Sequence, residues 1–143
     1  MGRLVVDHLL AAGWEVTVLN RGKTPSPFPP NAKLHFIKCD RFTRGRFREA
    51  LRTCEWSAVV DFVAFRPHSV EDVVCTLGQC VGHYVFISSD SVYMACSTPQ
   101  HNGKILEVDA VRPTSEAERR QLRRRDSYQY GYGGGKLACE EAL

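Results

Sequence analysis

Two residue types that can move a proton lie near the end of the chain, four positions apart. The stretch "YGGGK" places Tyr132 and Lys136 with three glycines between them. On a helix, positions four apart share one face, so the phenol and the ammonium stay close together. A tyrosine otherwise titrates at about pH 10, and a neighbouring ammonium favours the phenolate form. The pair therefore indicates acid–base chemistry at a hydroxyl group.

A third polar group follows the predicted strand "HYVFISSD", which ends with Ser89 and Asp90. A serine hydroxyl can hold the substrate oxygen whose proton moves, as hydride transfer at an alcohol carbon requires. Asn, Asp, Ser and Gly are also the residues that form ordinary turns. For any one strand end taken alone, we favour a turn over a functional site. Serine, tyrosine and lysine together favour an acid–base set.

The elements that must position these residues alternate between helices and strands. Helical apolar spacing predicts helices over 2–13, 44–54, 69–80 and from about Tyr128, after its glycines. Alternating or continuous apolar runs predict strands over 14–20, 33–40, 57–65 and 83–90. We expect 57–65 to be buried on both faces, Ser69 to be a helix N-cap, 21–32 to be a proline-rich loop, and 91–127 to be irregular.

This order predicts a doubly wound α/β domain with a parallel sheet over residues 1–143. In such sheets, ligands bind beyond the carboxyl ends of the strands. Asn20 and Arg21 end the first predicted strand, and Asp40 and Arg41 end the second. These side chains are therefore candidates for ligand contacts at the same edge as Ser89.

Composition limits the remaining classes of function. The chain is 43% hydrophobic and 24% charged, which is typical of a soluble globular protein. It has no apolar run of the roughly 20 residues that a membrane span needs, and no signal-peptide pattern, so we expect a cytoplasmic protein without a membrane partner. The six cysteines and five histidines, including His101, show no metal-ligand spacing, and we expect reduced, mostly buried thiols.

A basic run, "ERRQLRRRD", contains Arg119, Arg120, Arg123, Arg124 and Arg125. Such a run is usually a solvated helix face or a loop. The alternative is contact with RNA phosphates, with Tyr128, Tyr130 and Tyr132 available for base stacking. The net charge of +3 is too small to indicate nucleic-acid binding by itself.

Five segments, in order, resemble the extended short-chain dehydrogenase/reductase superfamily, specifically its NAD-dependent epimerase/dehydratase branch. "GRLVVDHLLAAGWEVTVLNRG" resembles the first helix and second strand of the family, and "SAVVDFVAF" resembles its fourth strand. "YVFISSDSVY" resembles the serine-bearing strand end, and "YGGGK" resembles the Tyr-x-x-x-Lys motif. The resemblance implies a Rossmann-like fold.

The resemblance also implies catalytic roles. Tyr132 matches the general acid/base, Lys136 the residue that assists it and hydrogen-bonds the nicotinamide ribose, and Ser89 the catalytic serine. Asp90 matches the acid of the sugar-nucleotide dehydratases. In those enzymes the next residue is Glu, whereas here it is Ser91, and this difference argues against a dehydratase.

The implied cofactor is NADP or NAD. NAD-preferring members have an acidic residue at the end of the second strand, where this chain has Asn20 and Arg21. Because a guanidinium suits a 2′-phosphate, we favour NADP. The resemblance assigns the adenine contacts to Asp40 and Arg41. It also assigns the small residue near the nicotinamide to Ala64.

Of the family motif G-x-x-G-x-x-G, only the last glycine has a match, Gly2. We therefore expect a partial NAD(P)-binding domain that lacks the first strand, the glycine-rich loop and the substrate-binding portion, and thus an inactive fragment of a longer enzyme. The family's commonest substrates are nucleotide sugars, and the full-length protein can be a homodimer. Two alternatives stay open: an RNA-binding protein of the same fold, similar to the chloroplast stem-loop-binding proteins, and a non-functional fragment.

Overall fold

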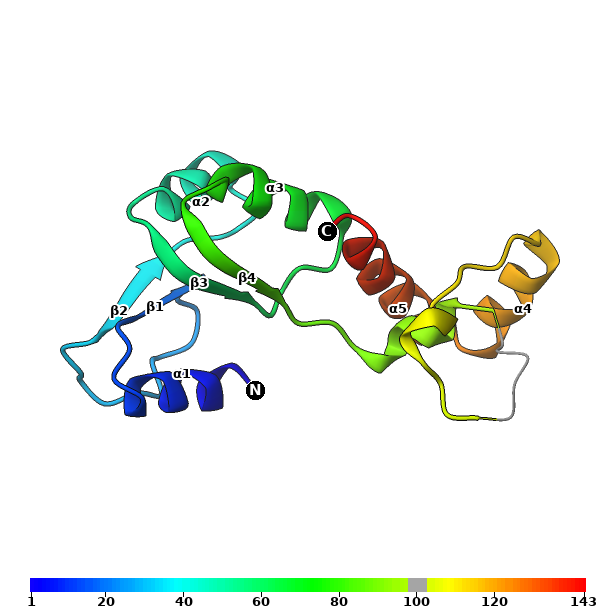
Figure 1. The fold of residues 1–143 in the computed structure, drawn as a ribbon, viewed down its shortest axis with the longest axis horizontal. Helices are drawn as coiled ribbons and strands as arrows, with labels where there is room; N and C mark the ends of the chain where they lie inside the picture. Colours follow the sequence, from blue (N-terminus) through cyan, green and yellow to red (C-terminus); the bar gives the residue numbers. More distant parts are fainter. Residues whose placement is uncertain (98–102) are drawn as a thin grey trace. The chain divides into compact units, whose positions relative to one another are not determined.

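The computed structural model describes residues 1–97 and 103–143 (Figure 1). Its elements are α1 (Gly2–Ala11), β1 (Val16–Asn20), β2 (Leu34–Lys38), α2 (Arg44–Leu51), β3 (Trp56–Asp61), α3 (Pro67–Leu77), β4 (Val81–Phe86), the 3₁₀ helices η1 (Asp90–Ala95) and η2 (Glu107–Asp109), α4 (Glu116–Arg125) and α5 (Ser127–Glu140). They form two compact units, Met1–Glu55 and Trp56–Leu143. The predicted alternation of helices and parallel strands is confirmed.

The first unit contains a parallel pair of strands, β1 and β2. Their register runs from Val16 opposite Leu34 to Asn20 opposite Lys38. The apolar side chains that begin the two strands, Val16 and Leu34, are buried, as is Phe47 of α2. The helix α1 ends just before Gly13, whose φ of 88° suits a residue without a Cβ.

The second unit contains the parallel pair β3 and β4, with Trp56 opposite Val81 and Asp61 opposite Phe86. The strand β3 ends at Asp61, four residues earlier than predicted, because the Asp61 carboxylate accepts hydrogen bonds from the backbone N–H groups of Val63 and Ala64 and turns the chain. The expectation that this strand is buried on both faces is wrong, since its early residues are exposed.

The helix α3 begins earlier than predicted, and Ser69 is not its N-cap. Pro67 is the first helical residue and Arg66 is the N-cap, because the fixed φ of proline suits the first turn. Ser69 is instead buried inside that turn, and its N–H donates to the carbonyl of Arg66 at 2.8 Å.

Two expectations about the last third of the chain are wrong. The segment 91–127 is not irregular throughout, because it contains most of η1, all of η2 and the arginine-rich helix α4. Three arginines end α4, where cations complement the helix dipole. The helix α5 begins at Ser127, before its glycines, because the Asp126 carboxylate caps the N–H of Gln129 at 2.9 Å. Residues 98–102, including His101, lie outside the described residues.

All six cysteines are free thiols, but only Cys39, Cys96 and Cys139 are buried. The expectation of mostly buried thiols therefore holds for half of them. Within residues 1–97 and 103–143, no cluster of His, Cys, Asp and Glu could hold a metal ion. Among the described helices, none has the length and apolar character needed to cross a membrane.

Candidate active site

In the first unit, the polar residues predicted at the ends of β1 and β2 meet at one edge. The N–H of Cys39 donates to the carbonyl of Asn20 at 2.8 Å, which joins the two strand ends. The Asn20 side chain accepts from the N–H of Gly22 at 2.7 Å, and Asp40 accepts in the same way from Phe42 at 3.0 Å. Both side chains therefore form turns, as the alternative interpretation of these residues predicts.

The two arginines beside these turns differ in their surroundings. The guanidinium of Arg41 lies over the ring of Phe47, 5.4 Å from its centroid, so it packs on α2. Arg21 is exposed. Gly2 is the first residue of α1, in the same unit. Cofactor contacts of these residues stay predictions.

In the second unit, the turn after β3 is organised by Asp61, which is 7% exposed. Besides its two backbone donors, its carboxylate accepts a hydrogen bond from the Tyr84 hydroxyl at 3.1 Å. This network holds Ala64, which is fully buried against Val70 and Cys139. The sequence interpretation missed the role of Asp61, although a carboxylate at the end of an apolar run is a visible signal.

The end of β4 leads into η1, and Ser89 is the N-cap of this short helix. The Ser89 hydroxyl oxygen accepts from the N–H of Ser91 at 3.2 Å. Its hydrogen-bond partners also include the Asp90 carboxylate at 3.3 Å and the Ser91 hydroxyl at 3.1 Å. Ser89 is half-buried and Asp90 is exposed. The predicted catalytic serine thus has a structural role in this turn.

The helix α5 packs directly on this segment (Figure 1), and its glycines make the close approach possible. A Cβ atom at Gly133 would stand 1.7 Å from the carbonyl oxygen of Ser91, and one at Gly135 would stand 2.7 Å from that of Phe65. Real Cβ atoms essentially never come within 3.0 Å of another heavy atom in this way. Gly133 and Gly135, two of the three glycines between Tyr132 and Lys136, therefore serve backbone packing.

Lys136 is the largest fully buried side chain of the described residues, with 2% exposure. Its ammonium donates to the carbonyl oxygen of Ile87 at 2.7 Å. It also lies 4.7 Å from the ring centroid of Phe65 and 4.6 Å from that of Phe86. A buried charge requires such compensation, and aromatic ring faces supply part of it.

Tyr132, one turn before Lys136, is half-buried. Its ring lies 6.0 Å from that of Phe65, and it stacks on Tyr128 with an interplanar angle of 4°. Phe65 therefore contacts both members of the Tyr-x-x-x-Lys pair. The sequence interpretation missed it because the contact joins residues far apart in the chain.

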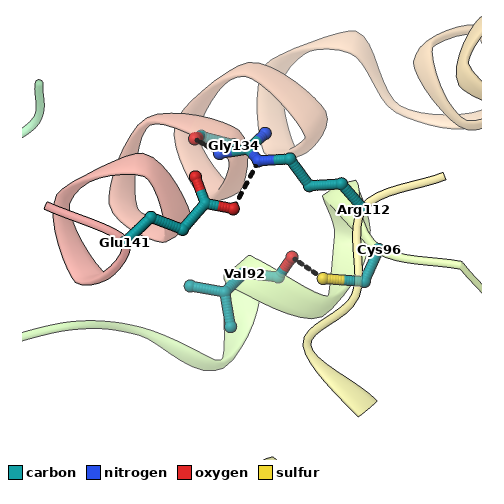
Figure 2. Close-up of polar contacts among 5 residues, drawn as sticks. All are labelled: Val92, Cys96, Arg112, Gly134 and Glu141. Atoms are coloured by element: carbon teal, nitrogen blue, oxygen red, sulfur yellow. Dashed lines mark hydrogen bonds and ion pairs between the residues drawn. The ribbon is translucent and has the colours of Figure 1, made fainter. Parts of the chain in front are cut away.

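Two further contacts attach α5 to its surroundings. The Ser88 hydroxyl donates to the Glu140 carboxylate, one helical turn beyond Lys136. Figure 2 shows Arg112 reaching α5, where it donates to Glu141 at 2.7 Å and to the carbonyl of Gly134 at 3.0 Å. The hydrogen bond to Glu141 raises the pKa of Arg112 above its usual value, so this guanidinium stays charged.

Cys96 lies beside this attachment and is 2% exposed. Its thiol donates to the carbonyl of Val92 at 3.1 Å (Figure 2). Burial raises the pKa of the Cys96 thiol, although the nearby positive charge of Arg112 acts in the opposite direction. The thiolate form that would act as a nucleophile or metal ligand is therefore disfavoured at this position.

An α/β fold with parallel strands binds its ligands beyond the carboxyl ends of those strands, which is where Asn20, Asp40 and Asp61 lie in this chain. The chain belongs to the NAD dependent epimerase/dehydratase family, which matches residues 1–117. Tyr132 and Lys136 lie beyond the matched residues, so their catalytic roles stay predictions. No curated protein sequence matches this chain.

The fold is similar to that of a solved protein, the Bordetella bronchiseptica enzyme WbmG, whose crystal structure is in complex with NAD. The TM-score is 0.67 over 97% of this chain, and the sequence identity is 18%. This similarity shows the Rossmann-like fold. The chain spans 44% of the length of WbmG.

The family name implies a nicotinamide dinucleotide, and the edge formed by β1 and β2 fits its adenosine end. Asn20, Arg21 and Asp40 present an amide, a guanidinium and a carboxylate there, which are suitable partners for ribose hydroxyls, phosphate and adenine nitrogens. Gly2 is the one glycine of the expected phosphate-binding motif among these 143 residues.

Proposed function

We propose that the protein is an NAD(P)-dependent oxidoreductase of the epimerase/dehydratase type, with Tyr132, Lys136 and Ser89 as its acid–base residues. The main supporting observation is the hydrogen bond from Lys136 to Ile87, which fastens the Tyr-x-x-x-Lys helix to the strand end that leads to Ser89. The absence of a Cβ at Gly133 permits the same approach.

In the proposed reaction, the phenol of Tyr132 exchanges a proton with a substrate hydroxyl. The ammonium of Lys136 supplies a positive charge one helical turn away, which favours proton release from the phenol. The Ser89 hydroxyl orients the substrate oxygen. A bound nicotinamide would supply hydride chemistry at the substrate carbon.

We further propose NADP as the preferred cofactor and a nucleotide-sugar-like substrate. Arg21 is exposed at the edge of the first unit and can donate to a 2′-phosphate. Asp90 is exposed next to Ser89, where it can approach a substrate. Because Ser91 follows it in place of Glu, we favour epimerisation or reduction over dehydration.

A second candidate function is RNA binding through α4. All five of its arginines are exposed, and the guanidinium of Arg123 lies 5.4 Å from the ring centroid of Tyr130. RNA affinity that falls steeply with salt and is lost in the Arg123→Ala, Arg124→Ala double variant would support this function. RNA affinity that is unchanged in that variant, or absent from the wild type, would reject it.

Tyr132→Phe tests the enzyme. In the whole protein, we expect conversion of nucleotide sugars, followed by chromatography of the sugar products, to fall by about 10²–10⁴-fold, while fluorescence titration shows unchanged cofactor binding. The matched control is Tyr128→Phe, which removes the same hydroxyl from the stacked ring one turn earlier and should leave turnover unchanged. Near-wild-type turnover in Tyr132→Phe would reject the acid–base role.

A further inference from the structure

The side chain of Lys38 lies over the turn that follows β1. Lys38 ends β2 directly opposite Asn20, which ends β1. A Cβ atom at Gly22 would stand 2.9 Å from Cδ of Lys38 and 3.0 Å from its Cγ and Cε. The methylene stem of this lysine thus passes across Gly22, and its ammonium is one bond further on.

The turn is shaped to admit this side chain. Gly22 has a φ of 62°, in the left-handed region that favours glycine. The N–H of Gly22 is held by the side chain of Asn20 at 2.7 Å. Since Arg21 lies between these two residues in the chain, two strands deliver two cationic side chains, Arg21 and Lys38, to one edge.

Both cations are exposed, whereas Arg41, the first cation after β2, packs over Phe47. A pair of exposed cations at the end of parallel strands suits a doubly charged phosphate more than a ribose hydroxyl. A neutral 2′-hydroxyl gains little from a second cation, so a second cation at this edge would favour NADP over NAD.

We propose that Lys38 is a specificity-determining residue that binds, together with Arg21, the 2′-phosphate of NADP. This inference rests on the proposed function, which requires a dinucleotide at this edge. The contact between the Lys38 ammonium and the 2′-phosphate would be an exposed charge pair, so we expect it to contribute only modestly to affinity.

The test measures binding of NADPH and NADH to the protein by fluorescence titration, and of adenosine 2′,5′-bisphosphate and 5′-AMP by calorimetry. The variant Lys38→Met keeps the stem over Gly22 and removes the charge. We expect it to weaken NADPH and adenosine 2′,5′-bisphosphate binding by about three- to tenfold, and NADH and 5′-AMP binding by less than about twofold. The salt dependence of NADPH binding should also decrease.

Lys104→Met is the matched control, because it removes an exposed lysine of the second unit and should change none of these affinities. Equal affinity losses for NADPH and NADH in Lys38→Met, or no loss for either, would overturn the role of Lys38 while the enzyme assignment stands. A wild type that prefers NADH would do the same. A wild type that binds neither dinucleotide would reject the proposed function and this inference together.

Discussion

Lys136 donates a hydrogen bond to the carbonyl oxygen of Ile87 at 2.7 Å, across 49 positions of the chain. This single contact connects the helix with the candidate acid–base pair to the strand end with the candidate serine. The ammonium is buried between the rings of Phe65 and Phe86. The lysine is therefore part of the packing of the second unit as well as of its proposed chemistry.

We expect Lys136→Met to lower the free energy of unfolding by about 1–3 kcal/mol. The variant fills a similar volume but leaves the Ile87 carbonyl without this donor, and a buried unsatisfied polar group costs about that much. Urea unfolding followed by circular dichroism measures the change. Lys104→Met, at an exposed lysine, should change stability by less than about 0.5 kcal/mol. Equal stability of the two variants would show that the contact is energetically unimportant.

The glycines of α5 allow a comparison within one helix. Gly133→Ala would place a Cβ 1.7 Å from the Ser91 carbonyl oxygen, whereas a Cβ at Gly131 meets nothing within 4 Å. We expect Gly133→Ala to destabilise the protein by about 1–3 kcal/mol or more, because the helix must shift. Gly131→Ala should stabilise it by up to about 1 kcal/mol through helix propensity. Equal effects in thermal unfolding would contradict the close packing of α5 on η1.

Cysteine reactivity should divide the thiols into two groups. At pH 7.5 we expect maleimide to modify the exposed Cys54, Cys75 and Cys80, and to spare Cys39, Cys96 and Cys139. Because burial raises the pKa of Cys96, this thiol loses its proton at a higher pH in the folded than in the unfolded chain. Its contribution to stability is therefore present below the ordinary thiol pKa and is lost as pH rises through the higher folded value.

Mass spectrometry of the labelled peptides measures which cysteines react, and urea-unfolded protein, where all six should react, is the control. Labelling of Cys96 as fast as that of Cys54 in the folded protein would contradict its burial.

Arg112 and Glu141 should show direct coupling. Both side chains are partly exposed, at 41% and 48%, so we expect a double-mutant cycle with Arg112→Met and Glu141→Gln to give only about 0.5–1 kcal/mol. Arg112→Met should cost more than Glu141→Gln, because Arg112 also donates to the Gly134 carbonyl. A coupling energy of zero in denaturant unfolding would contradict the ion pair in Figure 2.

Local interactions explain which expectations the structure confirms. Apolar periodicity predicted the four strands, since burial of one or both faces dictates that pattern. The turn residues Asn20, Asp40 and Ser89 were also readable, because each side chain bonds the N–H two positions later in the chain. The start of a helix was harder to predict where two residues were candidate N-caps. In α3 the N-cap is Arg66, and not Ser69 as predicted.

The sequence by itself determined the α/β order, the family resemblance and the residue types at the strand ends, because these depend on neighbours within a few positions. Only the tertiary structure decided that Gly133 faces the Ser91 carbonyl, that Phe65 contacts both Tyr132 and Lys136, and that Lys38 crosses Gly22. Each of these contacts joins segments that are distant in the chain. Their geometry follows from how helices and strands pack, which no local spacing encodes.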